Sequence, residues 1–278
     1  MTENSYSAVA VMINKGVATI TINNPPINLF DEALIRDLDR AGQTLCDRPD
    51  IKVIVIESAN ADFFIAHADV SAIQQLPPAG EPGGELRTAF HQVVDRFRKT
   101  PKATIAKIEG RCRGGGSELA LACDMRFAAI GKALLSQPEV GLGIIPGGGG
   151  STRLPRIVGR ARALEIILGC SDFDAELAER YGYVNRALPA DKIGLFVDKL
   201  ATRIASFPAE TIAVAKEAVT LKDADLEEDL ALERQFFLRS ANTESAKLRM
   251  AKAMSFGLQT ESVGKGGMAE LWDLGNNI

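Results

Sequence analysis

Histidine and cysteine are both scarce in this chain of 278 residues. The two histidines, His67 and His91, offer little material for a histidine-based zinc site or a serine–histidine triad. The four cysteines lack the close spacing of metal ligands, so we expect buried free thiols rather than disulfides. They are Cys46, Cys112, Cys123 and Cys170. These shortages favour chemistry that needs no metal.

Long apolar runs and an excess of positive charge are missing as well. No apolar run approaches the roughly 18–20 residues needed to cross a bilayer. Residues 1–7 lack the basic and apolar blocks of a signal peptide and the arginine-rich character of a transit peptide. We therefore expect a cytoplasmic protein with no membrane partner. The net charge of −4 argues against nonspecific nucleic-acid binding, which needs clustered cations.

What the chain does have is a globular composition, with 46% hydrophobic and 24% charged residues. Apolar runs at 9–13 and 17–22 flank a polar turn with glycine and predict a β-hairpin. Apolar residues at helical spacing from Leu34 to Leu45 predict a helix capped by Asp31. We expect further strands at 51–56, 63–70 and 103–108, and a helix at 85–99. This alternation predicts an α/β fold with short connections.

Two parts of the chain depart from this alternation. Segment 77–84 is rich in proline and glycine and predicts an exposed loop, or a flap near a pocket. After residue 207 we expect amphipathic helices at 209–222, 226–240 and 243–256. Their apolar surface exceeds what isolated surface helices need, so we expect them to pack on the core and on a neighbouring subunit.

Two glycine-rich segments each bring a carboxylate to a turn. Glycines 114–116 open a helix that carries Glu118, and Glu139 precedes the glycine-rich run 141–150. Tight turns expose backbone N–H groups, and the start of a helix points them at negative charge. Donors for an oxyanion beside two acids indicate an enzyme. Taken singly, Glu118 could be a helix-capping charge and Glu139 a loop acid or an ion-pair partner.

These segments carry a resemblance to a known family. Segment 108–124 resembles the signature of the enoyl-CoA hydratase/isomerase (crotonase) family, and segments 137–147 and 151–156 continue it. The resemblance is strong over the first two-thirds of the chain and looser after that, and it is closest to enoyl-CoA hydratase. It implies a spiral of stacked strand-strand-helix turns over residues 1–205. It also implies a helical region over 206–278 that builds a homotrimer or a dimer of trimers.

The resemblance further implies a reaction, the addition of water to 2-enoyl-CoA to give 3-hydroxyacyl-CoA. The backbone N–H groups of Ala68 and Gly115 would form the oxyanion hole for the thioester oxygen. Glu118 and Glu139 would hold the water, one removing its proton and the other supplying a proton at the α carbon. The N–H of Gly147 would help to position the water. No cofactor is expected, because coenzyme A is part of the substrate.

Further substrate contacts follow from the same match, and two features depart from the family pattern. The expected contacts are Pro26, Ala66, His67, Asp69 and Val70. His67 replaces a common glycine, and we favour a side chain that points away from the reacting atoms over one that narrows the acyl pocket or titrates near neutral pH. The usual lysines near the coenzyme are missing. Arg111 and Arg113 could compensate, although a solvated strand end is the favoured interpretation.

Several alternatives stay open. One is Δ3-Δ2 enoyl-CoA isomerisation, in which a single glutamate moves a proton between the α and γ carbons. Others are a different crotonase-type reaction on an acyl-CoA, such as thioester hydrolysis or decarboxylation, and a catalytically silent CoA-binding protein. A nucleotide-binding oxidoreductase is disfavoured, because segment 141–146 lacks the third glycine of the dinucleotide pattern. The presence of both acids favours the hydratase.

Overall fold

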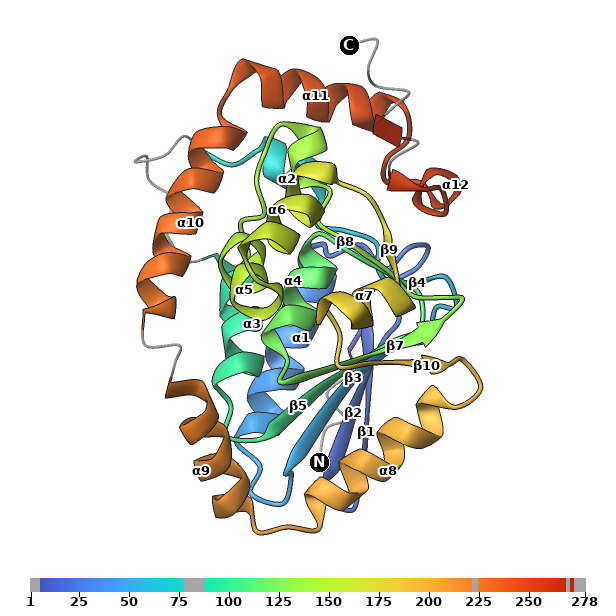
Figure 1. Cartoon of the computed structure of the whole chain (residues 1–278), viewed down its shortest axis with the longest axis vertical. Coiled ribbons are helices and arrows are strands. Elements are labelled where there is room, and N and C mark those ends of the chain that lie inside the picture. The colour runs from blue at the N-terminus through green and yellow to red at the C-terminus, as the bar shows by residue number, and fades with distance from the viewer. Residues whose placement is uncertain (1–5, 78–87, 222–224, 269–270, 273–278) are drawn as a thin grey trace.

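The computed structural model describes residues 6–77, 88–221, 225–268 and 271–272. In Figure 1 the strands gather in the lower half of the molecule, and the C-terminal helices α10 (Leu226–Ala241) and α11 (Glu244–Ser255) run along its left side and over its top. None of the helices in the described ranges combines the length and the apolar character that a membrane crossing requires.

A six-stranded sheet forms the centre of the fold, in the order β1-β2-β3-β5-β7-β10. β1 and β2 form the expected antiparallel hairpin, and its two turn residues, Lys15 and Gly16, both have positive φ. All other neighbours in this sheet are parallel. The strands are β1 (Val9–Asn14), β2 (Val17–Ile22), β3 (Val53–Ser58), β5 (Ala103–Ile108), β7 (Met125–Ile130) and β10 (Arg186–Pro189).

Hydrophobic layers cover both faces of this sheet, as β3 shows. Val53 and Val55 belong to the cluster that contains α8 (Ile193–Ala205). Ile54 and Ile56 belong to the cluster on the other face, formed with α1 and α3. Side chains alternate along a strand, so burial on both faces explains why this stretch of sequence is continuously apolar. The two covering helices are α1 (Glu32–Cys46) and α3 (Ala89–Lys99).

A second, four-stranded sheet, in the order β4-β6-β8-β9, completes the spiral. After the hairpin β1–β2 and α1, the turns that begin with β3, β5 and β7 each place one strand in the large sheet, the next strand in the small sheet, and then a helix. The elements of the small sheet and the helices that follow are β4 (Phe63–Ile65), α2 (Val70–Gln74), β6 (Arg111–Arg113), α4 (Gly115–Ala122), β8 (Leu134–Ser136), η1 (Glu139–Leu142), α5 (Gly150–Val158), α6 (Arg160–Gly169), β9 (Phe173–Asp174) and α7 (Ala175–Tyr181). This repeat confirms the strand-strand-helix spiral.

Element boundaries differ from the sequence prediction in two places. The strand expected at 51–56 begins at Val53. The extended segment expected at 63–70 ends early, because the side chain of Asp69 caps α2 and accepts a hydrogen bond from the N–H of Ser71 at 2.9 Å. With this cap the chain changes from an extended segment to a helix at Asp69, which is one of the expected site residues.

Part of the prediction falls outside the described residues. The loop expected at 77–84 lies outside them except for Pro77, and so do residues 85–87 of the helix expected at 85–99. Within the described part this helix is α3, with Thr88 at its N-cap.

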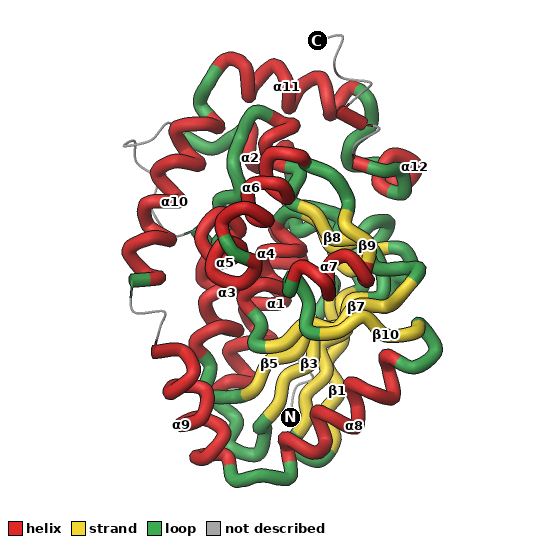
Figure 2. Tube along the Cα trace, viewed as in Figure 1, coloured by secondary structure: helices red, strands yellow, loops and turns green. Residues whose placement is uncertain are grey.

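The C-terminal helices match the expected amphipathic segments and pack on the spiral of the same chain. Val70 and Leu142 from the spiral share one apolar cluster with Phe237 and Met250 from α10 and α11. Figure 2 shows α10 at the left of the other helices and α11 above them, on the side away from the large sheet. The two further C-terminal helices are α9 (Ala209–Thr220) and α12 (Glu261–Gly264).

All four cysteines are free thiols, as expected. Cys112, Cys123 and Cys170 are buried, whereas Cys46 is only half-buried. Burial raises the pKa of the Cys123 thiol to about 12 and that of Cys170 to about 11, so both stay protonated at neutral pH.

The expectation that Arg111 and Arg113 lie at a solvated strand end is wrong. Arg113 is only 1% exposed, and its guanidinium pairs with Asp172 at 2.6 Å and donates to carbonyl groups of segment 264–266. Arg111 donates to the same segment. The reason is that backbone carbonyl groups at the end of α12 have no partner within that helix, and the arginine side chains of β6 reach them and donate hydrogen bonds.

The close packing of α4 on β4 can be tested at Gly116. A Cβ there would lie 2.6 Å from the Cβ of Ile65 and 2.8 Å from its carbonyl oxygen. We expect Gly116→Ala to lower the free energy of unfolding by about 2 kcal/mol, measured by urea denaturation. Gly194→Ala is the control, because a Cβ at this position in α8 meets nothing within 4 Å. Unchanged stability of Gly116→Ala would contradict this packing.

Candidate active site

A cavity of about 300 Å³ lies between the spiral and the C-terminal helices, with a mainly apolar lining. Pro26 and Ala66 do not line it, since Pro26 is exposed and Ala66 is buried in a separate small cluster. The structure brings the other expected site residues together at the cavity. They are His67, Ala68, Asp69, Val70, Gly115, Glu118, Glu139 and Gly147.

Two backbone donors meet at this cavity. A Cβ built on Gly115 would lie 3.3 Å from the Cβ of Ala68, so the two residues are in contact. Phe30 pairs with this segment through the carbonyl of His67 and the N–H of Asp69. Neighbouring residues of an extended segment point their N–H groups to opposite sides, which leaves the N–H of Ala68 facing away from Phe30. The N–H of Gly115 begins α4 and has no partner within that helix.

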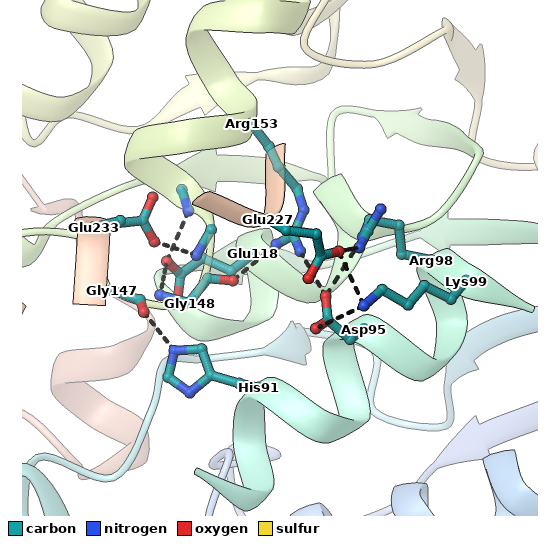
Figure 3. Close-up of polar contacts among 12 residues, drawn as sticks. His91, Asp95, Arg98, Lys99, Glu118, Gly147, Gly148, Arg153, Glu227 and Glu233 are labelled. Carbon is teal, nitrogen blue, oxygen red and sulfur yellow. Dashed lines mark hydrogen bonds and ion pairs between the residues drawn. The ribbon is translucent and has the colours of Figure 1, made fainter. Parts of the chain in front are cut away.

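Glu118 reaches from the first turn of α4 to a loop of glycines at 147–150, the glycine loop. Its side chain is buried, and Oε1 accepts the N–H of Gly148 at 2.7 Å and that of Gly150 at 2.9 Å (Figure 3). The carboxylate therefore accepts hydrogen bonds from N–H groups at the start of α5 and not from those of its own helix. The helix-capping interpretation of Glu118 does not hold.

Glu139 begins η1 and lies against the turn that starts α4. Its Oε1 would be 2.9 Å from a Cβ at Gly114, and its side chain is buried. With its amide oriented to satisfy both neighbours, Gln137 donates to Oε2 of Glu139 at 3.1 Å and accepts from Ser117. The two acids thus flank the same turn, each held by different neighbours.

A third buried carboxylate, Glu233 on α10, was not predicted from the sequence. Its Oε1 accepts the N–H of Gly149 at 2.5 Å, so the glycine loop is held by two carboxylates from separate helices, α4 and α10 (Figure 3). Arg153 lies beside them, donating to the carbonyl of Gly148 at 2.9 Å and pairing with Asp95 at 3.4 Å.

A pattern in the sequence could have revealed this acid. Glu233 lies four residues before Phe237, and Arg234 lies four residues before Leu238, at the spacing that puts side chains on one face of a helix. Two charged residues therefore interrupt the apolar face of α10, which indicates buried charges with a specific task.

Burial raises the pKa values of the three acids, and the charge of Glu118 adds to this effect at the other two. Burial raises the pKa of Glu118, but hydrogen bonds from Gly150 and Gly148 oppose this by stabilising the carboxylate. Burial and the charge of Glu118 raise the pKa of Glu139 well above its ordinary value. The pKa of Glu233 rises to about 8 for the same two reasons. The backbone hydrogen bonds therefore favour the ionised form at Glu118 over the ionised forms of its two neighbours.

Both histidines are neutral and bound to backbone carbonyls. His91 Nε2 donates to the carbonyl of Gly147 at 2.7 Å, and burial lowers its pKa to about 4. His67 lies between the carbonyls of Ala68, 2.8 Å from Nδ1, and Leu258, 3.3 Å from Nε2, and burial lowers its pKa. His67 lines the cavity, and as a neutral imidazole with one N–H it can donate to only one of these two carbonyls. Across the described ranges, no group of three or more histidine, cysteine or acidic side chains is placed to hold a metal ion.

Comparisons with known proteins identify the family and the fold of this chain. The family model described as Enoyl-CoA hydratase/isomerase matches residues 12–257. The chain belongs to the enoyl-CoA hydratase/isomerase family. A solved structure from Streptomyces avermitilis is similar in fold with a TM-score of 0.88 and 38% identity, covering 99% of this chain and 100% of that one. The crotonase-type fold is thereby confirmed.

Two curated relatives of this family illustrate the similarity. A Mycobacterium tuberculosis protein named "Probable enoyl-CoA hydratase echA8" is 35% identical over 249 residues, which is 89% of this chain and 95% of that protein. A Clostridium acetobutylicum protein named "Short-chain-enoyl-CoA hydratase" is 30% identical over 233 residues, which is 83% of this chain and 88% of that protein.

The raised pKa of Glu233 predicts a pH-dependent stability. A carboxyl group with an ordinary pKa of 4.5 when unfolded and about 8 when folded keeps a proton only in the folded state over that interval, so stability falls as the pH rises through it. Glu233→Gln removes this titration while its amide oxygen still accepts from Gly149. We expect the gain in melting temperature of the variant over wild type to be on the order of 5 °C larger at pH 9 than at pH 6.

The exposed Glu210 on α9 supplies the control, because Glu210→Gln should change the melting temperature equally at both pH values. A gain for Glu233→Gln that is the same at pH 6 and pH 9 would show that Glu233 is not protonated in the folded protein.

Proposed function

We propose that the protein is a hydro-lyase that adds water to the double bond of a 2-enoyl-CoA and forms a 3-hydroxyacyl-CoA. The observation that carries this proposal is that two buried acids, Glu118 and Glu139, come from separate glycine-rich segments and line the same cavity. The names of the two curated relatives support it. An isomerase needs one acid at this place, whereas water addition uses both.

The oxyanion hole is assigned to the N–H groups of Ala68 and Gly115. Attack of water at the β carbon moves negative charge onto the thioester oxygen, and donors that are already oriented stabilise that charge by about 3 kcal/mol each. The contact between these two residues and the position of Gly115 at the start of α4 support the assignment.

The two acids take different parts in the proton transfers. Ionised Glu118 accepts a proton from the water as its oxygen bonds to the β carbon, and protonated Glu139 delivers a proton to the α carbon. A proton then passes from Glu118 to Glu139 to restore the starting state. The hydrogen bonds from the glycine loop favour this division, since they stabilise the carboxylate of Glu118 alone. The N–H of Gly147 is assigned to the water.

The remaining substrate contacts follow from the size of the cavity. Asp69, Val70 and His67 line it and are assigned to the acyl part of the substrate. Coenzyme A is too large for about 300 Å³, so Pro26 and the backbone of Ala66 are assigned to coenzyme A outside the cavity. Coenzyme A belongs to the substrate, and the proposed reaction needs no other cofactor.

A homotrimer, or a dimer of trimers, is proposed for the assembly. The C-terminal helices cover their own spiral, yet they still expose large apolar side chains. Among these are Leu232, Phe236, Leu248 and Phe256. Contact with other copies would bury them. The cytoplasmic location and the division of the chain at residues 205 and 206 stay predictions from the sequence.

Substitution of the two acids tests the function. Hydration removes the absorbance of the conjugated thioester, so it can be followed with crotonyl-CoA and longer 2-enoyl-CoAs. We expect Glu118→Gln and Glu139→Gln each to lower kcat/KM by roughly 1,000-fold, because each removes one proton transfer. Glu210→Gln should keep wild-type activity.

Absence of hydration by the wild-type protein with every 2-enoyl-CoA would refute the hydratase. Conversion of a 3-enoyl-CoA to its conjugated isomer under the same conditions would then identify an isomerase.

His67 provides a second test, because its ring is bound to backbone carbonyls and is neutral. We expect His67→Gly to retain hydration within about tenfold of wild type and to leave the pH profile between pH 6 and 7 unchanged. A hundredfold loss of kcat/KM, measured in the same assay, would show that His67 contacts the reacting atoms.

A further inference from the structure

Arg234 on α10 carries a buried guanidinium at the wall of the cavity. The residue is 3% exposed and lines the same cavity as Glu118 and Glu139. Its Nε and Nη2 atoms have no hydrogen-bond partner among the described residues. Its guanidinium carbon lies 5.1 Å from the centroid of the apolar Phe237 ring, and its charge is among the causes that lower the pKa of His91. The charge is therefore nearly removed from water, and none of the carboxylates in the described ranges forms an ion pair with it.

Two other buried arginines of this protein have carboxylate and backbone carbonyl partners. Arg113 pairs with Asp172 and with backbone carbonyls, and Arg153 pairs with Asp95 and with a carbonyl of the glycine loop. An unpaired buried charge is costly, and proteins retain one mainly where a partner arrives later. Burial lowers the pKa of Arg234 with no neighbouring carboxylate to oppose it. The structure thus leaves a place for an anion.

The surroundings of Arg234 indicate where that anion comes from. Glu118 and Glu139 form no ion pair with it, and the lining of the cavity is mainly apolar, with Phe90, Ile144 and Phe237 among its residues. An acyl chain whose thioester lies at Ala68 and Gly115 would fill this apolar space. If that chain were wholly apolar, it would displace the remaining water and leave the guanidinium with nothing to bind.

We propose that Arg234 binds a carboxylate on the acyl chain, so that the substrates are 2-enoyl-CoA thioesters of dicarboxylic acids. A guanidinium matches a carboxylate in charge and shape, because two parallel N–H groups can donate to its two oxygens. A neutral polar group would satisfy the donors but leave the charge unbalanced. This inference rests on the proposed hydratase function for the reaction, although the binding of the carboxylate can be measured without it.

Binding of saturated thioesters tests the proposal, because they are not hydrated. Glutaryl-, adipyl- and suberyl-CoA are compared by calorimetry with the monocarboxylic thioesters of equal length, pentanoyl-, hexanoyl- and octanoyl-CoA. We expect at least one dicarboxylic thioester to bind the wild-type protein on the order of 100-fold more tightly than its partner. Arg234→Met should abolish this preference, and Arg234→Lys should retain part of it.

Arg239→Met is the matched control. Arg239 lies on the same helix and stacks on Phe236 at the same distance of 5.1 Å, but it is exposed. It should leave the preference unchanged. Equal binding of both thioester classes by the wild-type protein would overturn the proposal without any variant. A preference that survives in Arg234→Met would overturn it too, by assigning the carboxylate to another residue.

The matching 2-enoyl thioesters separate this result from the function itself. Tight binding of dicarboxylic thioesters without hydration of any 2-enoyl-CoA would refute the hydratase while upholding the role of Arg234. Hydration of monocarboxylic and dicarboxylic substrates with equal kcat/KM, together with equal binding, would uphold the hydratase and refute the role of Arg234.

Discussion

The site depends on the two carboxylates that hold the glycine loop. Glu118 accepts from Gly148 and Gly150, and Glu233 accepts from Gly149. Three successive N–H groups at the start of α5 thereby donate to buried carboxyl oxygens, and the charge of Glu118 is favoured at this helix N-terminus. Because Glu118 belongs to the spiral and Glu233 to α10, the same bonds fix the C-terminal helices over the cavity. Helix α10, Glu118 and the glycine loop therefore form one connected unit.

Because three acids are buried close together in this unit, their pKa values differ. Glu118 receives backbone donors, whereas Glu139 contacts Gln137 and the turn at Gly114. Once one buried carboxylate is ionised, its charge makes the ionisation of a second one less favourable. A proton donor and a proton acceptor can then coexist at the same pH, although both are glutamates. Identical side chains acquire different chemistry from their hydrogen bonds alone.

The sequence predicts the local features of this fold and misses the long-range ones. The hairpin, the helix capped by Asp31 and the positions of Glu118 and Glu139 follow from apolar periodicity and glycine spacing over short stretches. Burial of Arg113 does not, because its partners lie in segment 264–266, far along the chain. Glu233 likewise bonds to a loop more than eighty residues earlier. The pattern of residues within a helix identifies its buried face but not the residues that this face contacts.

The position of α10 also governs when the enzyme comes into existence during synthesis. A ribosome makes the spiral first, and domains begin to fold in that order. A nascent chain that ends before α10 has Glu118 and the glycine loop but lacks Glu233, Phe237 and the wall they supply. Its cavity is open to water. The catalytic pocket is therefore completed only near the end of translation, and unfinished chains cannot enclose a thioester.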